Sequence, residues 1–120
     1  AGMNQERVFK VLLGPLVAGR IYPDVTPDKP LFPLIVYQGV GGTEQWYVEG
    51  KRREKRHQRV QVYVWATTRL EASGIADLVG TALCESGFPA VEPYGAPTSL
   101  YEEAIKKYGT RQDFGIWYQP

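Results

Sequence analysis

Residues 60–65 alternate between valine and larger polar or aromatic residues, in the order Val60, Gln61, Val62, Tyr63, Val64, Trp65. Successive side chains of a β-strand point to opposite faces of a sheet, so this alternation predicts a strand with one aliphatic and one amphipathic face. A capping box follows directly, in which Thr68 caps a helix and Glu71 reaches back three residues later. The chain therefore passes from a half-buried strand into an amphipathic helix.

Two amphipathic helices are available to cover the valine face. The first starts at Asn4 as N-cap and ends or kinks at Gly14-Pro15, because proline lacks an amide donor and clashes with the preceding turn. The second follows Thr68 and carries an apolar stripe. We expect six side chains from the strand and this second helix to meet in the core: Val60, Val62, Val64, Ile75, Val79 and Leu83.

Further strands are predicted at residues 20–22, 34–37 and 114–118. The strand at 34–37 and the strand at 60–65 resemble a hairpin with a long polar arm over residues 43–58. Ser99, with Glu102 three residues later and Gly109 at the exit, indicates a helix over residues 99–108.

These elements predict an α+β fold: an antiparallel sheet of about four strands, two main helices packed on one face, and the long hairpin arm. A length of 120 residues suits a single domain, which we expect over residues 3–120. Ala1-Gly2 precede Met3 and are interpreted as a remnant of cloning.

Composition narrows the class of protein. Hydrophobic residues make up 43% and charged residues 22%, which is typical of a globular domain. No apolar run is long enough to cross a bilayer and no secretory leader precedes the domain, so no membrane partner is expected. The single cysteine, Cys84, forms no intrachain disulfide and fits a reducing compartment.

Candidate catalytic groups are sparse. The glycines at 39, 41 and 42 follow a strand but precede no helix, which favours a bend over a phosphate loop. His57 lies among arginines, and Cys84 lies near the C-terminal end of a helix, where a thiolate is disfavoured. With one cysteine and one histidine, zinc ligation is not expected. We therefore expect no enzyme, no metal and no cofactor.

Six cations fall in one short stretch in which Glu54 is the single acidic residue: Lys51, Arg52, Arg53, Lys55, Arg56 and Arg59. We call these six residues the basic cluster. It is either a solvated hairpin tip that protects a sheet edge, or an electrostatic contact for phosphate or an acidic protein face. Three aromatic residues opposite the valine face also allow two interpretations. They are either a second core layer or a subunit interface: Tyr63, Trp65 and Trp117.

The whole pattern resembles the small tail-completion, or tail-terminator, proteins of long-tailed bacteriophages and prophages. The resemblance rests on the order and spacing of an N-terminal helix, the segments at 19–23, 32–37 and 59–66, Glu71-Ala72 opening the next helix, and the segment at 113–117. It extends over nearly the whole chain. The family is typically extended between the second helix and the last strand, where this sequence predicts a helix.

The resemblance implies a ring, typically of six subunits, seated on the end of a tail tube. Such a ring stops tube growth and offers a docking surface to the head connector. Its partners are further copies of itself, the tail tube protein, the head-connector protein, and DNA that passes through the lumen without sequence specificity. The implied location is the bacterial host cytoplasm during assembly and then the virion tail.

A small nucleic-acid-binding module is the alternative. It would use the basic stretch over residues 51–59, with Trp46, Tyr47 and His57 as stacking groups. Tight, stacking-dependent binding by the isolated chain would distinguish this module from a ring subunit. An enzyme would instead show turnover that a single side-chain change abolishes.

Overall fold

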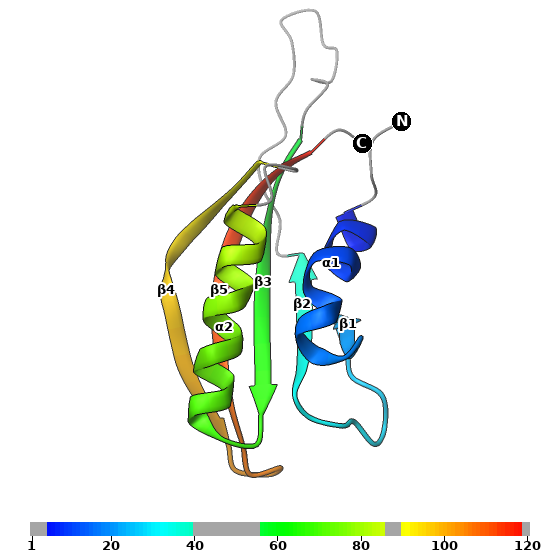
Figure 1. The fold of residues 1–120 in the computed structure, drawn as a ribbon, viewed down its shortest axis with the longest axis vertical. Coiled ribbons are helices and arrows are strands. Elements are labelled where there is room, and N and C mark those ends of the chain that lie inside the picture. Colours follow the sequence, from blue (N-terminus) through cyan, green and yellow to red (C-terminus); the bar gives the residue numbers. More distant parts are fainter. Residues whose placement is uncertain (1–4, 40–55, 86–89, 119–120) are drawn as a thin grey trace, which may run out of the picture.

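The computed structural model describes the backbone of residues 5–39, 56–85 and 90–118, and the side chains of residues 9–39, 59–85 and 91–116. Helices α1 (Gln5–Leu13) and α2 (Arg69–Cys84), with the short 3₁₀ helix η1 (Gly14–Val17), lie on one face of a single sheet (Figure 1). The α-helix α1 ends just before Gly14-Pro15, as the proline predicts, and the chain tightens there into η1.

Five strands form the sheet in the order β1-β2-β3-β5-β4. Their bounds are β1 (Ile21–Pro23), β2 (Leu34–Gly39), β3 (Arg56–Ala66), β4 (Ala90–Glu102) and β5 (Lys107–Tyr118). The pairs β2–β3, β3–β5 and β4–β5 are antiparallel, whereas β1 pairs with β2 in parallel. The prediction of an antiparallel sheet of about four strands is therefore wrong at the β1 edge, and the sheet is mixed.

Local geometry after η1 explains the parallel edge. Ala18 and Gly19 both have positive φ, at 52° and 80°, and turn the chain out of η1 into β1. The connection over residues 24–33 then brings the chain back to the same end of the sheet. Arg20 fastens that return, because its Nε donates to the carbonyl oxygen of Pro33 at 2.7 Å and its own carbonyl accepts from the amide of Ile35 at 2.9 Å. These contacts span more than ten residues, so no local pattern predicts them.

The core lies between the sheet and the two helices. Val60, Val62 and Val64 are each at most 2% exposed and belong to one cluster with side chains from both helices and from β5. The expected core is confirmed for all six predicted residues, and it is extended by Phe9, Leu13, Phe114 and Ile116. Each fully buried valine stabilises the fold by about 1.5–3 kcal/mol through apolar burial.

The capping box forms as predicted, with one change. Thr68 Oγ1 accepts from the amide of Glu71 at 3.2 Å, which satisfies one of the free donors at the start of α2. The Glu71 carboxylate accepts from the amide of Thr67 at 3.4 Å, one residue before the cap. The strand-to-helix transition is thus fixed by local hydrogen bonds.

The predicted helix over residues 99–108 is wrong. This segment is the end of β4, a turn, and the start of β5, which together form a long hairpin. In the turn, Lys106 has φ of 53° and the Glu102 carboxylate accepts from the amide of Ala104 at 3.2 Å. The serine and glutamate that favour a helix cap also favour turns, and here the ladder to β5 decides between them.

The hairpin predicted for residues 34–65 is confirmed in its pairing. β2 and β3 are antiparallel, with Tyr37 opposite Val62. Of the arm predicted for residues 43–58, residues 56–58 belong to β3 and the others lie outside the described residues.

Replacement of Val62 by aspartate should lower the free energy of unfolding by about 3 kcal/mol or more, because it places an unpaired charge in the core. Chemical denaturation monitored by circular dichroism measures the change. Val25→Asp is a matched control, since Val25 is 75% exposed and should tolerate the same substitution within about 0.5 kcal/mol. Equal stability of the two variants would contradict the core assignment.

Candidate functional site

The sheet face opposite the helices carries the polar and aromatic side chains of β3. Since Val60, Val62 and Val64 enter the core, the odd-numbered residues of β3 lie on this second face. The register places Gln61 opposite Asp113 and Trp65 opposite Gly109. Of the candidate residues that the sequence indicated, Arg59, Tyr63 and Trp65 thus share one face.

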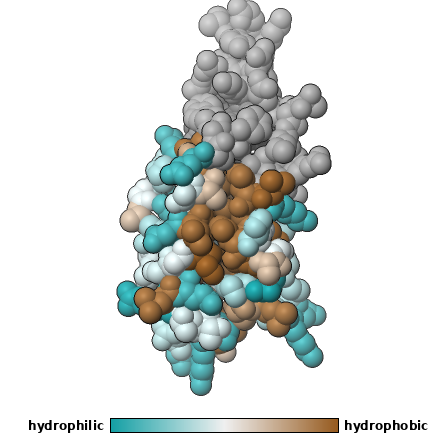
Figure 2. All heavy atoms as spheres, in the orientation of Figure 1, coloured by the Kyte–Doolittle hydropathy of each residue, from teal (hydrophilic) through white to brown (hydrophobic). Residues whose placement is uncertain are grey.

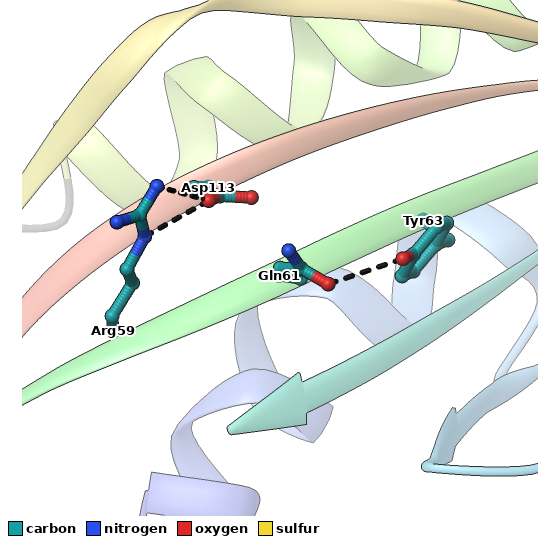
Figure 3. A network of polar contacts seen from close by, with 4 residues as sticks. All are labelled: Arg59, Gln61, Tyr63 and Asp113. Atoms are coloured by element: carbon teal, nitrogen blue, oxygen red, sulfur yellow. Dashed lines mark hydrogen bonds and ion pairs between the residues drawn. The ribbon is translucent and has the colours of Figure 1, made fainter. Parts of the chain in front are cut away.

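Arg59 is held by an acidic and an aromatic partner. Its Nε and Nη2 donate to the same Asp113 oxygen, at 2.9 and 2.6 Å (Figure 3). Its guanidinium carbon lies 5.3 Å from the centre of the Tyr94 ring, a cation–π distance. Asp113 is on β5 and Tyr94 on β4, so this cluster links three neighbouring strands. Asp113 offsets part of the Arg59 charge.

Tyr94 lies beside an irregularity of the sheet. The β4–β5 register shifts between Tyr94 and Thr98, where Gly95 has φ of 82°. Gln112 Nε2 donates to the Gly95 carbonyl oxygen at 2.8 Å and fastens this bulge. The Tyr94 hydroxyl donates to Glu92 at 3.0 Å, and the pKa of Tyr94 is raised by desolvation first and by Glu92 second.

Of the other five residues of the basic cluster, the structure describes only Arg56, and only its backbone. Arg56 is the first residue of β3 and pairs with Tyr118 along the backbone. The positions of Lys51, Arg52, Arg53 and Lys55 lie outside the described residues. Sequence reasoning found Arg59 as a cation but missed its partners, because nothing local marks Asp113, which is 54 residues away, or Tyr94. The alternating residues of β5 show which side chains lie near Arg59 only once the pairing of β5 with β3 is known.

The side chains of Tyr63 and Trp65 already make contacts within the chain. A Cβ atom on Gly109 would lie 2.6 Å from Trp65 Cε3, so the indole rests directly over that glycine. The Tyr63 hydroxyl donates to Gln61 Oε1 at 3.1 Å (Figure 3). Both side chains remain half-buried, which leaves part of each available to a neighbour. Trp117 pairs with His57 and Ala90 along the backbone, and its side chain lies outside the described part of the structure.

The helix-covered face has an apolar surface of its own. Leu12, Leu16 and Ala82 are only partly buried against the core, and Leu78 is 52% exposed. Figure 2 shows hydrophobic atoms gathered in the middle of this face, over the two helices. Contiguous apolar surface of this kind is typical of contact sites for other proteins.

Groups that could perform chemistry are few in the described part of the chain. Cys84 is exposed, and its pKa is raised by partial burial and by the charge of Glu85, which disfavours the thiolate. Residues 5–39, 56–85 and 90–118 contain no group of three or more histidine, cysteine or acidic side chains arranged to hold a metal ion. None of the helices described is long and apolar enough to cross a bilayer.

Comparison with known proteins identifies the family. The family model for tail completion protein gp17 matches residues 10–118, so the chain belongs to that family. A search of curated proteins found no sequence match. Among solved structures, the fold is similar to that of a chain in the virion of a native gene transfer agent particle, with a TM-score of 0.57. That chain is 14% identical, and the match covers 91% of this chain and 85% of the other.

Replacement of Gly109 by alanine should cost about 1–3 kcal/mol of stability, because the new methyl group would collide with the Trp65 ring. Gly74→Ala is the control: nothing lies within 4 Å of a Cβ there, and the change should stabilise α2 by about 0.5–1 kcal/mol. Thermal unfolding of both variants measures the contrast. Adding Trp65→Leu should recover only part of the Gly109→Ala loss, because the Val64 carbonyl oxygen would also lie 2.9 Å from the new Cβ. An unchanged loss would show that Trp65 does not contribute to the collision.

Proposed function

We propose that the protein completes phage or prophage tails by forming a ring on the end of the tail tube. The ring ends tube growth and provides the docking surface for the head connector. The observation that carries the proposal is the match of the tail completion family to residues 10–118. Residues 3–120 form the single domain of each subunit, and the ring holds six subunits.

The surfaces of the subunit support an assembly role. The half-buried Tyr63 and Trp65 lie on one face of the sheet, and partly exposed leucines lie over the helices on the other. A ring subunit needs two different contact surfaces, since a head-to-tail interface joins unlike patches on neighbouring copies. We assign Tyr63, Trp65 and Trp117 to one side of that interface. This role needs no catalytic centre, and the protein is not an enzyme.

The basic cluster gives the ring an electrostatic function. Arg56 begins β3 and Arg59 follows three residues later, so these two cations lie at one end of the central strand. Repetition of this charge around a ring strengthens the potential in a narrow lumen. Phosphates rather than bases would be contacted, so DNA passing through the lumen is held without sequence specificity. The protein then resides in the host cytoplasm during assembly and in the tail of the virion.

Deletion of the gene should produce tails of uncontrolled length, or heads and tails that fail to join, because nothing caps the tube. Negative-stain electron microscopy of the lysate measures tail length and the fraction of joined particles. A wild-type copy supplied in trans should restore both. Normal infectious particles without the protein would contradict the tail-completion role.

Replacement of Lys51, Arg52, Arg53, Lys55 and Arg56 by glutamine should leave folding intact and abolish head–tail joining or DNA retention. Arg59→Gln alone should have a much smaller effect, because Asp113 already offsets the charge of Arg59. Complementation of the deletion phage, with packaged DNA measured by nuclease protection, tests both variants.

A matched control removes the same number of charges elsewhere on the surface, by glutamine at Lys10, Lys29, Lys106, Lys107 and Arg111. It should complement normally. If the cluster variant also completes tails and retains DNA, the basic cluster is only a solvated tip. Tight DNA binding by the isolated chain that depends on Trp46 or Tyr47 would instead support the nucleic-acid-binding module.

A further inference from the structure

The start of α2 lies near the turn of the β4–β5 hairpin, at one end of the sheet (Figure 1). Residues of both elements line a hollow there, at the opposite end of β3 from Arg59. Its volume is about 210 Å³. Arg69 and Ser73 of α2 line one side, and residues of the hairpin line the other, chiefly Ser99, Tyr101, Tyr108 and Thr110. The two tyrosine rings pack against each other, with centroids 4.9 Å apart.

Thr110 is the first sign that the hollow receives a ligand. It is only 5% exposed, yet its hydroxyl makes no hydrogen bond to any residue of the described part of the chain. Ser99 is its direct partner across the β4–β5 ladder and brings a second hydroxyl to the same wall. A buried hydroxyl without a partner is costly, so such a group is expected to have a hydrogen-bond partner in the functional state.

Arg69 supplies the charge. No ion pair joins it to an acidic side chain among the described residues. One guanidinium beside the hydroxyls of Ser73, Ser99 and Thr110 forms a donor set for an anion with two oxygens. A carboxylate fits that set, because arginine donates to both carboxylate oxygens at once and hydroxyls donate to their remaining lone pairs.

The rim of the hollow indicates what carries the carboxylate. Two tyrosines that line it keep exposed ring surface, Tyr101 at 49% and Tyr108 at 38%. The hollow is smaller than the roughly 300–1,000 Å³ of sites for drug-sized ligands and cofactors. A small hollow that combines hydroxyl groups and one guanidinium with two tyrosine rings suits one side chain of a docked protein, with apolar neighbours resting on the tyrosines.

We infer that this hollow is a docking site for an acidic–apolar segment of a partner protein, in which an aspartate or glutamate enters between α2 and the β4–β5 hairpin. Its carboxylate accepts from Arg69 and from the Thr110 hydroxyl, and adjacent leucine-like side chains pack on Tyr101 and Tyr108. The site lies at the opposite end of β3 from Arg56. One subunit can therefore bind a protein at this end while the basic cluster contacts another partner.

Titration of the ¹⁵N-labelled protein with the peptide acetyl-Leu-Glu-Leu-amide tests the site by NMR. The amides of Ser73, Ser99 and Thr110 should shift and saturate at peptide concentrations of about 10 mM or less, as expected for one weak docked side chain. The glutamine analogue of the peptide should bind about tenfold more weakly, because it loses a charged hydrogen bond. Absence of saturable shifts, or equal binding of both peptides, would overturn the proposal.

Variants of the protein test which side chains bind the peptide. Arg69→Gln should weaken the glutamate peptide about tenfold and leave the glutamine peptide unchanged. Arg111→Gln is the control, because Arg111 lies opposite Tyr63 on the other face of the sheet. Thr110→Val keeps the side-chain shape, so it should weaken peptide binding without lowering stability. Retained binding in Arg69→Gln would refute the site, and so would a single-stranded oligonucleotide that gives the same Arg69-dependent shifts.

Discussion

Burial of the valine face of β3 beneath α1 and α2 is the interaction on which the remaining structure depends. β3 lies in the middle of the sheet, between β2 and β5, and its valines touch both helices. The capping box at Thr68 starts α2 immediately after the strand, so the helix returns over the face that it covers. Because side chains alternate along a strand, packing the valines inward also commits Arg59, Tyr63 and Trp65 to the opposite face.

That opposite face shows how stability and assembly share the same residues. Arg59 joins three strands through Asp113 and Tyr94, and Trp65 lies over Gly109. These contacts hold the central strands in register while the aromatic edges stay partly exposed. A subunit that presents preformed surfaces loses less conformational entropy when it assembles than one that must order them.

The subunit is also polarised along β3. Arg56 lies at one end of this strand, and Tyr108 and Tyr101 lie level with Ala66 at the other end. Two chemically different ends suit the tail-completion role proposed above for this family member. Both proposed contacts, with phosphate at one end and with a carboxylate at Arg69 at the other, join opposite charges, so added salt should weaken each of them.

Local sequence determined those elements that depend on residues close together in the chain. The alternation at Val60–Val64, written in consecutive residues, fixed a strand and its buried face, and Thr68 with Glu71 fixed the start of α2. The family resemblance was likewise carried by the order of short segments. Residues 99–108 show the limit of such reasoning, because Ser99 and Glu102 have capping chemistry that serves a turn as well as a helix.

Only the tertiary structure decided which strands pair and which side chains meet. The parallel edge depends on Arg20 bonding to Pro33, and the partner of Arg59 is 54 residues away. The hollow at Thr110 exists because β5 brings that residue against the start of α2. Such contacts arise when separate elements pack around one core. No single segment specifies them, because each depends on the position of every other element in the sheet.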